Sequence, residues 1–200
     1  MRKQIVGLAA AASIGGAALI AGAPTGNAAP ASHTSDTGQV SAAASSRGGK
    51  ISRAEVISRA KYWYTHRGSI KYSGTGTYRD PDSKSHKYRR DCSGFVSMAL
   101  HLKSAQSTIG LPSYGNKLKS RKSMKKGDYT GILGSGTGGA AGHVRIFEKW
   151  SSKSAGTYWA YDFGSTPVKH KVYKLSTDKS RRGTDGKTHG WTAYRYKKIS

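Results

Sequence analysis

Apolar residues at helical spacing mark two segments in the first half of the chain. The first follows the capping box Ser52-Arg53-Ala54-Glu55, which predicts a helix from Ser52 to Gly68. Its inward stripe is Val56, Ile57, Ala60, Trp63 and Tyr64. The second follows Asp91, where Phe95, Met98, Ala99 and Leu102 recur at the same spacing and place Cys92 in the first helical turn, on the buried face. Residues 69–90 between them are polar and rich in turn signals, so we expect an ordered loop or a short extended segment.

The second half of the chain alternates between apolar and polar residues. Val144, Ile146 and Trp150 alternate with polar or outward positions that begin at His143, and residues 158–163, 168–175 and 191–196 are rich in aromatic and β-branched side chains. Helices followed by antiparallel strands predict an α+β domain with N-terminal helices packed on a sheet.

The N-terminus has the three parts of a secretory signal. Two cations precede an apolar Ala/Gly-rich stretch, and Gly26-Asn27-Ala28 offers a small-residue cleavage site. We expect a signal peptide over 1–28, a flexible linker over 29–50 and one domain over 51–200. The apolar stretch is short for a membrane span, so the mature protein should be secreted, extracellular or cell-wall associated, with no membrane span.

Charge narrows the class of partner. The 34 Lys and Arg residues outnumber 10 Asp and Glu, a net charge of +24 that would be +22 without the leader. Such a surface repels its own copies and attracts polyanions, so we expect a monomer that binds anionic cell-wall polymers. Nucleic acid is not expected as a partner, because no helix-turn-helix, zinc-finger or aromatic stacking motif accompanies the charge.

The single cysteine suggests nucleophilic chemistry. A thiol at a helix N-terminus is favoured as thiolate, Asp91 can cap that helix, and Gly94 would leave space beside the sulfur for an oxyanion held by backbone amides. His143 opens an apolar strand and can act as base, and a hairpin would bring Asp162 beside it to orient the ring. Each residue also has a plain structural interpretation: an inert buried cysteine, a sheet histidine and a solvated carboxylate.

The other candidate motifs give weaker evidence of function. The remaining histidines show no pair at metal-ligand spacing, so we expect no metal and no cofactor. The glycines of 134–139 fit a dinucleotide-binding pattern but lead into a strand instead of a helix, and we interpret 131–142 as a mobile loop or plain linker.

Three motifs resemble those of the NlpC-type cell-wall cysteine peptidases. They are Asp91-Cys92-Ser93-Gly94-Phe95-Val96, then Gly127-Asp128, then Gly142-His143-Val144. The resemblance covers Ser52 to Phe163 and implies a papain-like fold, thiolate and acyl-enzyme chemistry by Cys92 and His143, and cleavage of peptidoglycan stem peptides next to D-glutamate. It also implies an oxyanion and substrate-binding role for Tyr72, with Asp91 and Ser93 beside the nucleophile.

Two departures from the family leave alternatives open. Many members carry His, Asn or Gln as third residue, whereas 151–156 lengthen the hairpin here and the candidate is the acid Asp162. Wall-binding repeats are also missing, so attachment would depend on charge. The alternatives are an amidase-type enzyme that cuts between sugar and peptide, an acyl transferase, and a non-catalytic cationic module that binds the cell wall.

Overall fold

The computed structural model describes residues 44–200. The predicted signal peptide 1–28 and residues 29–43 of the predicted linker lie outside the described residues. Residues 44–50 are held against the domain: the Ser45 hydroxyl donates to Glu55 at 2.6 Å, and the Gly48 N–H donates to the His101 carbonyl at 2.7 Å. Within 44–200, no helix has the length and apolar character that crossing a membrane requires.

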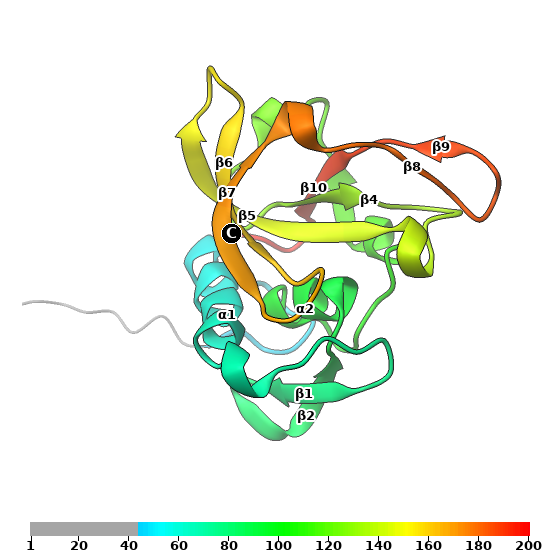
Figure 1. Cartoon of the computed structure of the whole chain (residues 1–200). Helices are drawn as coiled ribbons and strands as arrows, with labels where there is room; N and C mark the ends of the chain where they lie inside the picture. The colour runs from blue at the N-terminus through cyan, green and yellow to red at the C-terminus, as the bar shows by residue number, and fades with distance from the viewer. Residues whose placement is uncertain (1–43) are drawn as a thin grey trace, which may run out of the picture. The chain divides into compact units, whose positions relative to one another are not determined.

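The fold is α+β, as predicted, with two α-helices and a mostly antiparallel arrangement of strands (Figure 1). The helices are α1 (Arg53–Thr65) and α2 (Cys92–Ala99). The strands are β1 (Thr77–Asp80), β2 (Ser83–Arg89), β3 (Gly115–Lys117), β4 (Tyr129–Ile132), β5 (His143–Ser152), β6 (Thr157–Asp162), β7 (Lys169–Lys174), β8 (Arg181–Arg182), β9 (Thr188–His189) and β10 (Thr192–Tyr196). Six strands form one sheet in the order β3-β10-β4-β5-β6-β7, and β1-β2 and β8-β9 form separate hairpins.

Helix α1 begins as its capping sequence predicts. The Ser52 side chain accepts a hydrogen bond from the Glu55 N–H at 3.1 Å. The Glu55 carboxylate does not complete the capping box, because it accepts from Ser45 instead. The helix ends at Thr65, three residues before the predicted Gly68, and a 3-10 turn over Arg67–Ser69 follows.

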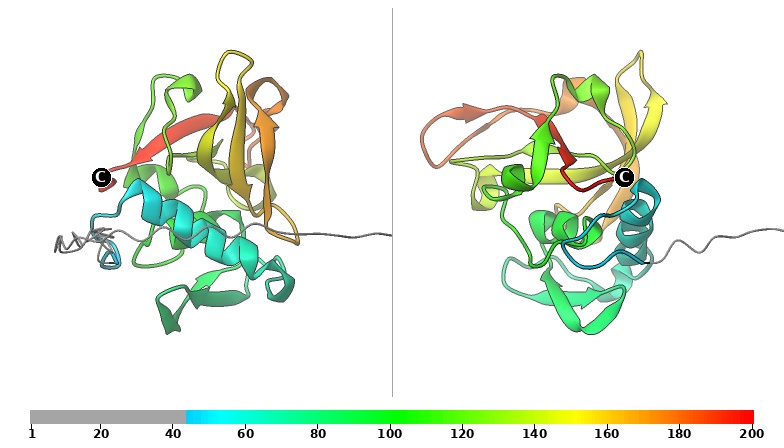
Figure 2. Two further views of the ribbon diagram at one scale, coloured as in Figure 1. Left: turned by 90° about the vertical axis from the view of Figure 1, so that its left-hand side faces the viewer. Right: turned by 180° about the vertical axis from the view of Figure 1, so that it is seen from behind.

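The main core lies between the two helices and one face of the sheet (Figures 1 and 2). Trp63 from α1, Phe95 from α2 and Phe163 after β6 are fully buried, with ring centroids 5.9 to 6.3 Å apart. Aromatic packing at these separations fixes the direction of each helix on the sheet. It therefore sets where the N-terminus of α2 meets the start of β5.

The helices are also covered on the side away from the sheet. There the β1-β2 hairpin packs against α2 (Figure 2). The polar segment 69–90, expected as a loop or short extended piece, is thus largely a two-stranded ribbon in which Asp80 and Tyr88 are buried. The Trp63 indole N–H donates to the Arg79 carbonyl at 3.1 Å and joins this ribbon to α1.

The glycine-rich segment 131–142 is more regular than a mobile loop. It begins inside β4 and contains a 3-10 turn over Gly139–Ala141. The Thr184 N–H from the β8-β9 connection donates to the Gly136 carbonyl at 2.9 Å, and Thr108 Oγ1 donates to the Thr137 carbonyl. These contacts fix the segment that leads to His143, because its backbone groups are satisfied by neighbours.

Candidate active site

Cys92 is the first residue of α2. Asp91 caps the helix, since its Oδ1 accepts from the Gly94 N–H at 2.7 Å. The sulfur therefore lies at the positive end of the helix, where first-turn N–H groups have no partner within the helix. The Cys92 residue is 6% exposed, and it lines a cleft of about 820 Å³.

Gly94 has a different role from the expected one. A Cβ at this position would lie 2.1 Å from the Arg89 carbonyl oxygen. The glycine permits the close approach of the chain before the helix, instead of making space beside the sulfur. Only a residue without a side chain allows α2 to begin at Cys92 in this position.

His143 is the first residue of β5 and lines the same cleft as Cys92. Its Nε2 lies 2.9 Å from Oδ1 of Asp162, the last residue of β6. A Cβ at Gly164 would lie 2.7 Å from the imidazole, so this glycine provides the space for the ring. The three side chains predicted to act together are thus brought to one place by α2, β5 and β6.

The Asp162 carboxylate is 6% exposed and divided between two sets of partners. Its Oδ2 accepts from Arg145 Nε at 3.0 Å and from the Tyr173 hydroxyl at 2.7 Å. Burial works to raise the pKa of Asp162, but the His143, Arg145 and Tyr173 groups outweigh it and hold the pKa well below its usual range. Asp162 therefore stays ionised beside the imidazole.

Burial and neighbouring groups also shift the pKa of His143. Burial works to lower the pKa of the imidazole, whereas hydrogen bonding to Asp162 and to Cys92 raises it, and the balance brings the pKa to about 9. At neutral pH the ring accordingly carries a proton next to the sulfur. With Nε2 directed at Asp162, Nδ1 is the ring nitrogen left for Cys92.

A further layer behind Asp162 escaped the sequence analysis. Arg145 Nη1 donates to Asp178 Oδ1 at 2.7 Å, and the guanidinium lies over the Tyr173 and Trp191 rings at 3.8 and 4.3 Å from their centroids. The Trp191 ring also meets the His143 ring edge-on, with centroids 5.8 Å apart. Arg145 could have been found by alternation, since it lies two residues after His143 on the same strand face.

Tyr72 lines the cleft, 39% exposed, and its ring packs on Phe163. Burial, and the nearby Cys92 and Asp91 groups, raise the pKa of its hydroxyl to about 12. The phenol remains protonated at neutral pH and can donate a hydrogen bond beside the sulfur.

Asp91 and Ser93 also line the cleft, but their side chains are occupied within the chain. The Ser93 hydroxyl donates to Asp91 Oδ1 at 3.2 Å and accepts from Arg89 Nη2 at 3.0 Å. Arg89 Nε also pairs with Asp91, and Arg89 Nη2 donates to the Gln106 carbonyl at 2.8 Å. These contacts show Asp91 and Ser93 supporting the start of α2.

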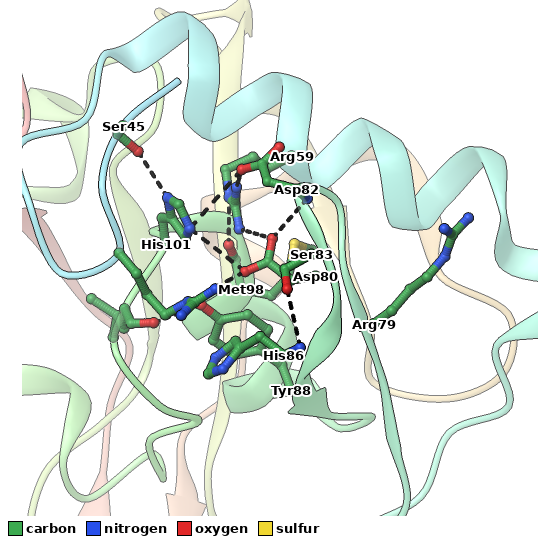
Figure 3. A network of polar contacts seen from close by, with 12 residues as sticks. Ser45, Arg59, Arg79, Asp80, Asp82, Ser83, His86, Tyr88, Met98 and His101 are labelled. Atoms are coloured by element: carbon green, nitrogen blue, oxygen red, sulfur yellow. Dashed lines mark hydrogen bonds and ion pairs between the residues drawn. The ribbon is translucent and has the colours of Figure 1, made fainter. Parts of the chain in front are cut away.

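A second polar cluster lies between α1, the β1-β2 hairpin and His101, which follows α2 (Figure 3). Glu55, Asp82 and His101 place ligand-type atoms within 4.8 Å of one another, a grouping that sequence spacing did not reveal. The buried Arg59 guanidinium lies among them, donating to Asp82 and, at 2.7 Å, to Asp80. Arg59 thus supplies the positive charge that a metal ion would otherwise bring, and the cluster joins α1 to the β1-β2 hairpin.

Comparisons of the chain with protein-family models, with curated proteins and with solved structures found no match.

Proposed function

We propose that the protein is an exported cysteine hydrolase that cleaves amide bonds in peptidoglycan stem peptides, with Cys92 as nucleophile, His143 as acid and base, and Asp162 as orienting residue. One observation carries the proposal: His143 lines the same cleft as Cys92, and its Nε2 lies 2.9 Å from the Asp162 carboxylate. The family-like motifs at these positions and the order of helices before an antiparallel sheet support an NlpC-type, papain-like fold.

The first half of the reaction forms an acyl-enzyme. His143 holds the proton of the Cys92 thiol, and the thiolate attacks the amide carbonyl carbon to form a carbon–sulfur bond. The carbonyl oxygen becomes an oxyanion, stabilised by first-turn N–H groups of α2 and by the Tyr72 hydroxyl. The carbon–nitrogen bond then breaks, and the amine leaves with the proton from His143.

The second half restores the enzyme. Neutral His143 takes a proton from water while the water oxygen attacks the thioester carbon. The carbon–sulfur bond breaks and releases the peptide as a carboxylic acid, which loses its proton to solvent. Thiolate and imidazolium remain, as at the start. Asp162 stays ionised throughout and stabilises the imidazolium.

Digestion of purified peptidoglycan tests the proposal. The wild-type protein should release new amino groups, and Cys92→Ala should release none. The mass of the soluble fragments identifies the bond: fragments cut within the stem peptide support the proposal, whereas intact stem peptides freed from sugar indicate an amidase. Unchanged release of amines by Cys92→Ala would reject the mechanism.

Alkylation separates an enzyme from a non-catalytic binding module. Iodoacetamide should label Cys92 rapidly and stoichiometrically at pH 7, because a catalytic thiol that lines an open cleft beside a histidine reacts faster than an inert buried thiol. His143→Ala should slow the labelling without unfolding the protein. Slow labelling of the folded wild type, equal to that of His143→Ala, would favour the binding module.

A further inference from the structure

Besides His143, four arginine and lysine side chains of residues 44–200 line the cleft, and two of them are neutralised by carboxylates of the chain. Arg89 pairs with Asp91. Arg145 pairs with Asp162 at 3.0 Å and with Asp178 at 2.7 Å. The charges of Arg89 and Arg145 are balanced by these carboxylates, so neither side chain is free to pair with an anionic group of a ligand.

Lys169 and Arg181 differ from this pair. Within residues 44–200, neither has a carboxylate oxygen within 4.0 Å of its charged nitrogens. The Lys169 ammonium donates to Ser165 Oγ at 3.1 Å, and Arg181 Nη1 donates to the Ala140 and Gly142 carbonyls at 3.0 and 3.2 Å. The cleft therefore holds two positive charges that no acidic side chain balances.

Arg181 is fixed next to the proposed base. One of the carbonyls that it binds belongs to Gly142, the residue directly before His143. The β8-β9 hairpin that carries Arg181 is itself attached to the glycine-rich segment through Thr184, whose N–H donates to Gly136. A guanidinium has five N–H donors, and these contacts use only Nη1, so Nε and Nη2 remain for a ligand.

Lys169 stands on a different wall of the cleft. It is the cross-strand partner of Asp162, so its side chain leaves the sheet on the same face as that carboxylate. The wall around it is formed by the β6-β7 connection, and Thr166 in that connection accepts from the Tyr72 N–H at 2.7 Å. A ligand lying across the sulfur would thus meet one free cation from each wall.

We infer that Arg181 and Lys169 are specificity-determining residues that bind carboxylates flanking the scissile amide, so that the preferred substrate is a peptide with a free carboxylate on each side of the bond. The inference rests on the proposed function, which says where the scissile amide would lie. Arg181 and Lys169 themselves lie C-terminal to the motifs that suggested that function. Amidated forms of the same peptide should be poor ligands, because a neutral amide cannot balance the two charges.

Kinetics on paired substrates test the inference. The probes are a γ-D-glutamyl-L-lysine peptide with both α-carboxylates free and the same peptide with both converted to amides. Arg181→Ala and Lys169→Ala should each lower kcat/KM for the acidic peptide about tenfold or more, as expected for a lost charge-assisted hydrogen bond, and should lower it much less for the amidated peptide. The matched controls are Arg182→Ala, on the opposite face of β8, and Lys174→Ala, exposed at the end of β7.

Binding to an inactive variant separates this inference from the proposed reaction. Calorimetry with Cys92→Ala should show at least tenfold tighter binding of the acidic peptide than of the amidated one, and that preference should disappear in Cys92→Ala/Arg181→Ala/Lys169→Ala. If wild type cleaves neither peptide but the binding preference holds, the proposed reaction fails, and the assignment of Arg181 and Lys169 as carboxylate-binding residues stands. Equal binding of the two peptides by Cys92→Ala would overturn the inference, whatever the activity.

Discussion

The Nε2 atom of His143 lies 2.9 Å from Oδ1 of Asp162, a buried oxygen that accepts no well-aligned hydrogen bond within residues 44–200 and is paired with the imidazole as an ion pair. The other oxygen, Oδ2, is held by Arg145 and Tyr173. The carboxylate is thus oriented from behind and presents one buried oxygen to the imidazole. A charge fixed in this way determines both the ring orientation and the proton affinity of His143.

The first prediction concerns the pH dependence of activity. In the wild type, activity should fall as pH rises through about 9, where His143 loses the proton that the leaving amine requires. Asp162→Asn removes the charge that raises the His143 pKa, so this fall should move to lower pH. At neutral pH the variant should lose activity by about 10²-fold or more, measured as kcat/KM on the acidic peptide.

A second acid–histidine pair on the same sheet supplies the control. Glu148 Oε2 lies 3.0 Å from His170 Nε2, away from the cleft. Glu148→Gln should leave the pH profile unchanged. A profile of Asp162→Asn that coincides with that of the wild type would exclude Asp162 as the orienting residue.

The second prediction concerns Gly94, two residues after the proposed nucleophile. Gly94→Ala places a methyl group against the Arg89 backbone and should destabilise the protein by about 1–3 kcal/mol in denaturant unfolding. It should also reduce alkylation of Cys92, since the start of α2 must move. Gly68→Ala is the matched control, because nothing lies within 4 Å of a Cβ there, and its stability should stay within about 0.5 kcal/mol of wild type. Equal stability of the two variants would contradict the packing described for Gly94.

The candidate site could be predicted where residues belong to periodic elements. Cys92 and His143 each open a segment with clear hydrophobic spacing, and strand alternation placed Asp162 near His143. Asp178, which holds Arg145 from behind, lies in an irregular segment after β7. Periodicity gives no position for such a residue, so the outer layer of the site had to come from the structure.

The fold, too, could be predicted where the sequence is periodic and could not be predicted where contacts between distant residues decide the structure. The β1-β2 hairpin has no hydrophobic alternation because one of its buried residues is the charged Asp80, which Arg59 neutralises from α1 across 21 positions in sequence. The glycines of segment 131–142 predict a mobile loop or a plain linker, whereas the structure shows contacts from Thr184 and Thr108 that hold it in place. In both cases the stabilising partner is remote in sequence, where local patterns carry no information.

The third prediction concerns stability against pH. The folded-state pKa of His143 is about 9, above the ordinary value of 6.5, so its contribution to stability is fully present below pH 6.5 and is lost as pH rises through 9. The free energy of unfolding of wild type should therefore exceed that of His143→Gln by on the order of 2 kcal/mol at pH 6, and the difference should shrink by pH 10. A difference that stays constant from pH 6 to pH 10 would show that the imidazole is not held in its charged form.

The last prediction concerns the second polar cluster. Arg59 is 3% exposed and donates to Asp80, to Asp82 and, at 2.9 Å, to the Met98 carbonyl. Removing it leaves the buried Asp80 carboxylate with only the longer contacts to Arg47 at 3.7 Å and His101 at 3.5 Å, so Arg59→Ala should destabilise the protein by about 3–5 kcal/mol in denaturant unfolding. The exposed Lys61 on the same helix is the control, and Lys61→Ala should change stability by less than about 0.5 kcal/mol.

The double variant Arg59→Met/Asp80→Leu distinguishes a lost ion pair from lost packing. It replaces both charges with apolar groups of similar volume and should recover much of the stability that Arg59→Ala loses, because no unpaired charge remains buried.

The pH dependence of stability gives a second readout. Arg59 and His101 hold the pKa of Asp80 below its usual range against the effect of burial, so the carboxylate stabilises the fold above its unfolded pKa, and this contribution is lost as pH falls below it. If acidification destabilises the double variant as steeply as wild type in the pH 2–4 range, the buried pair is not the source of the acid sensitivity.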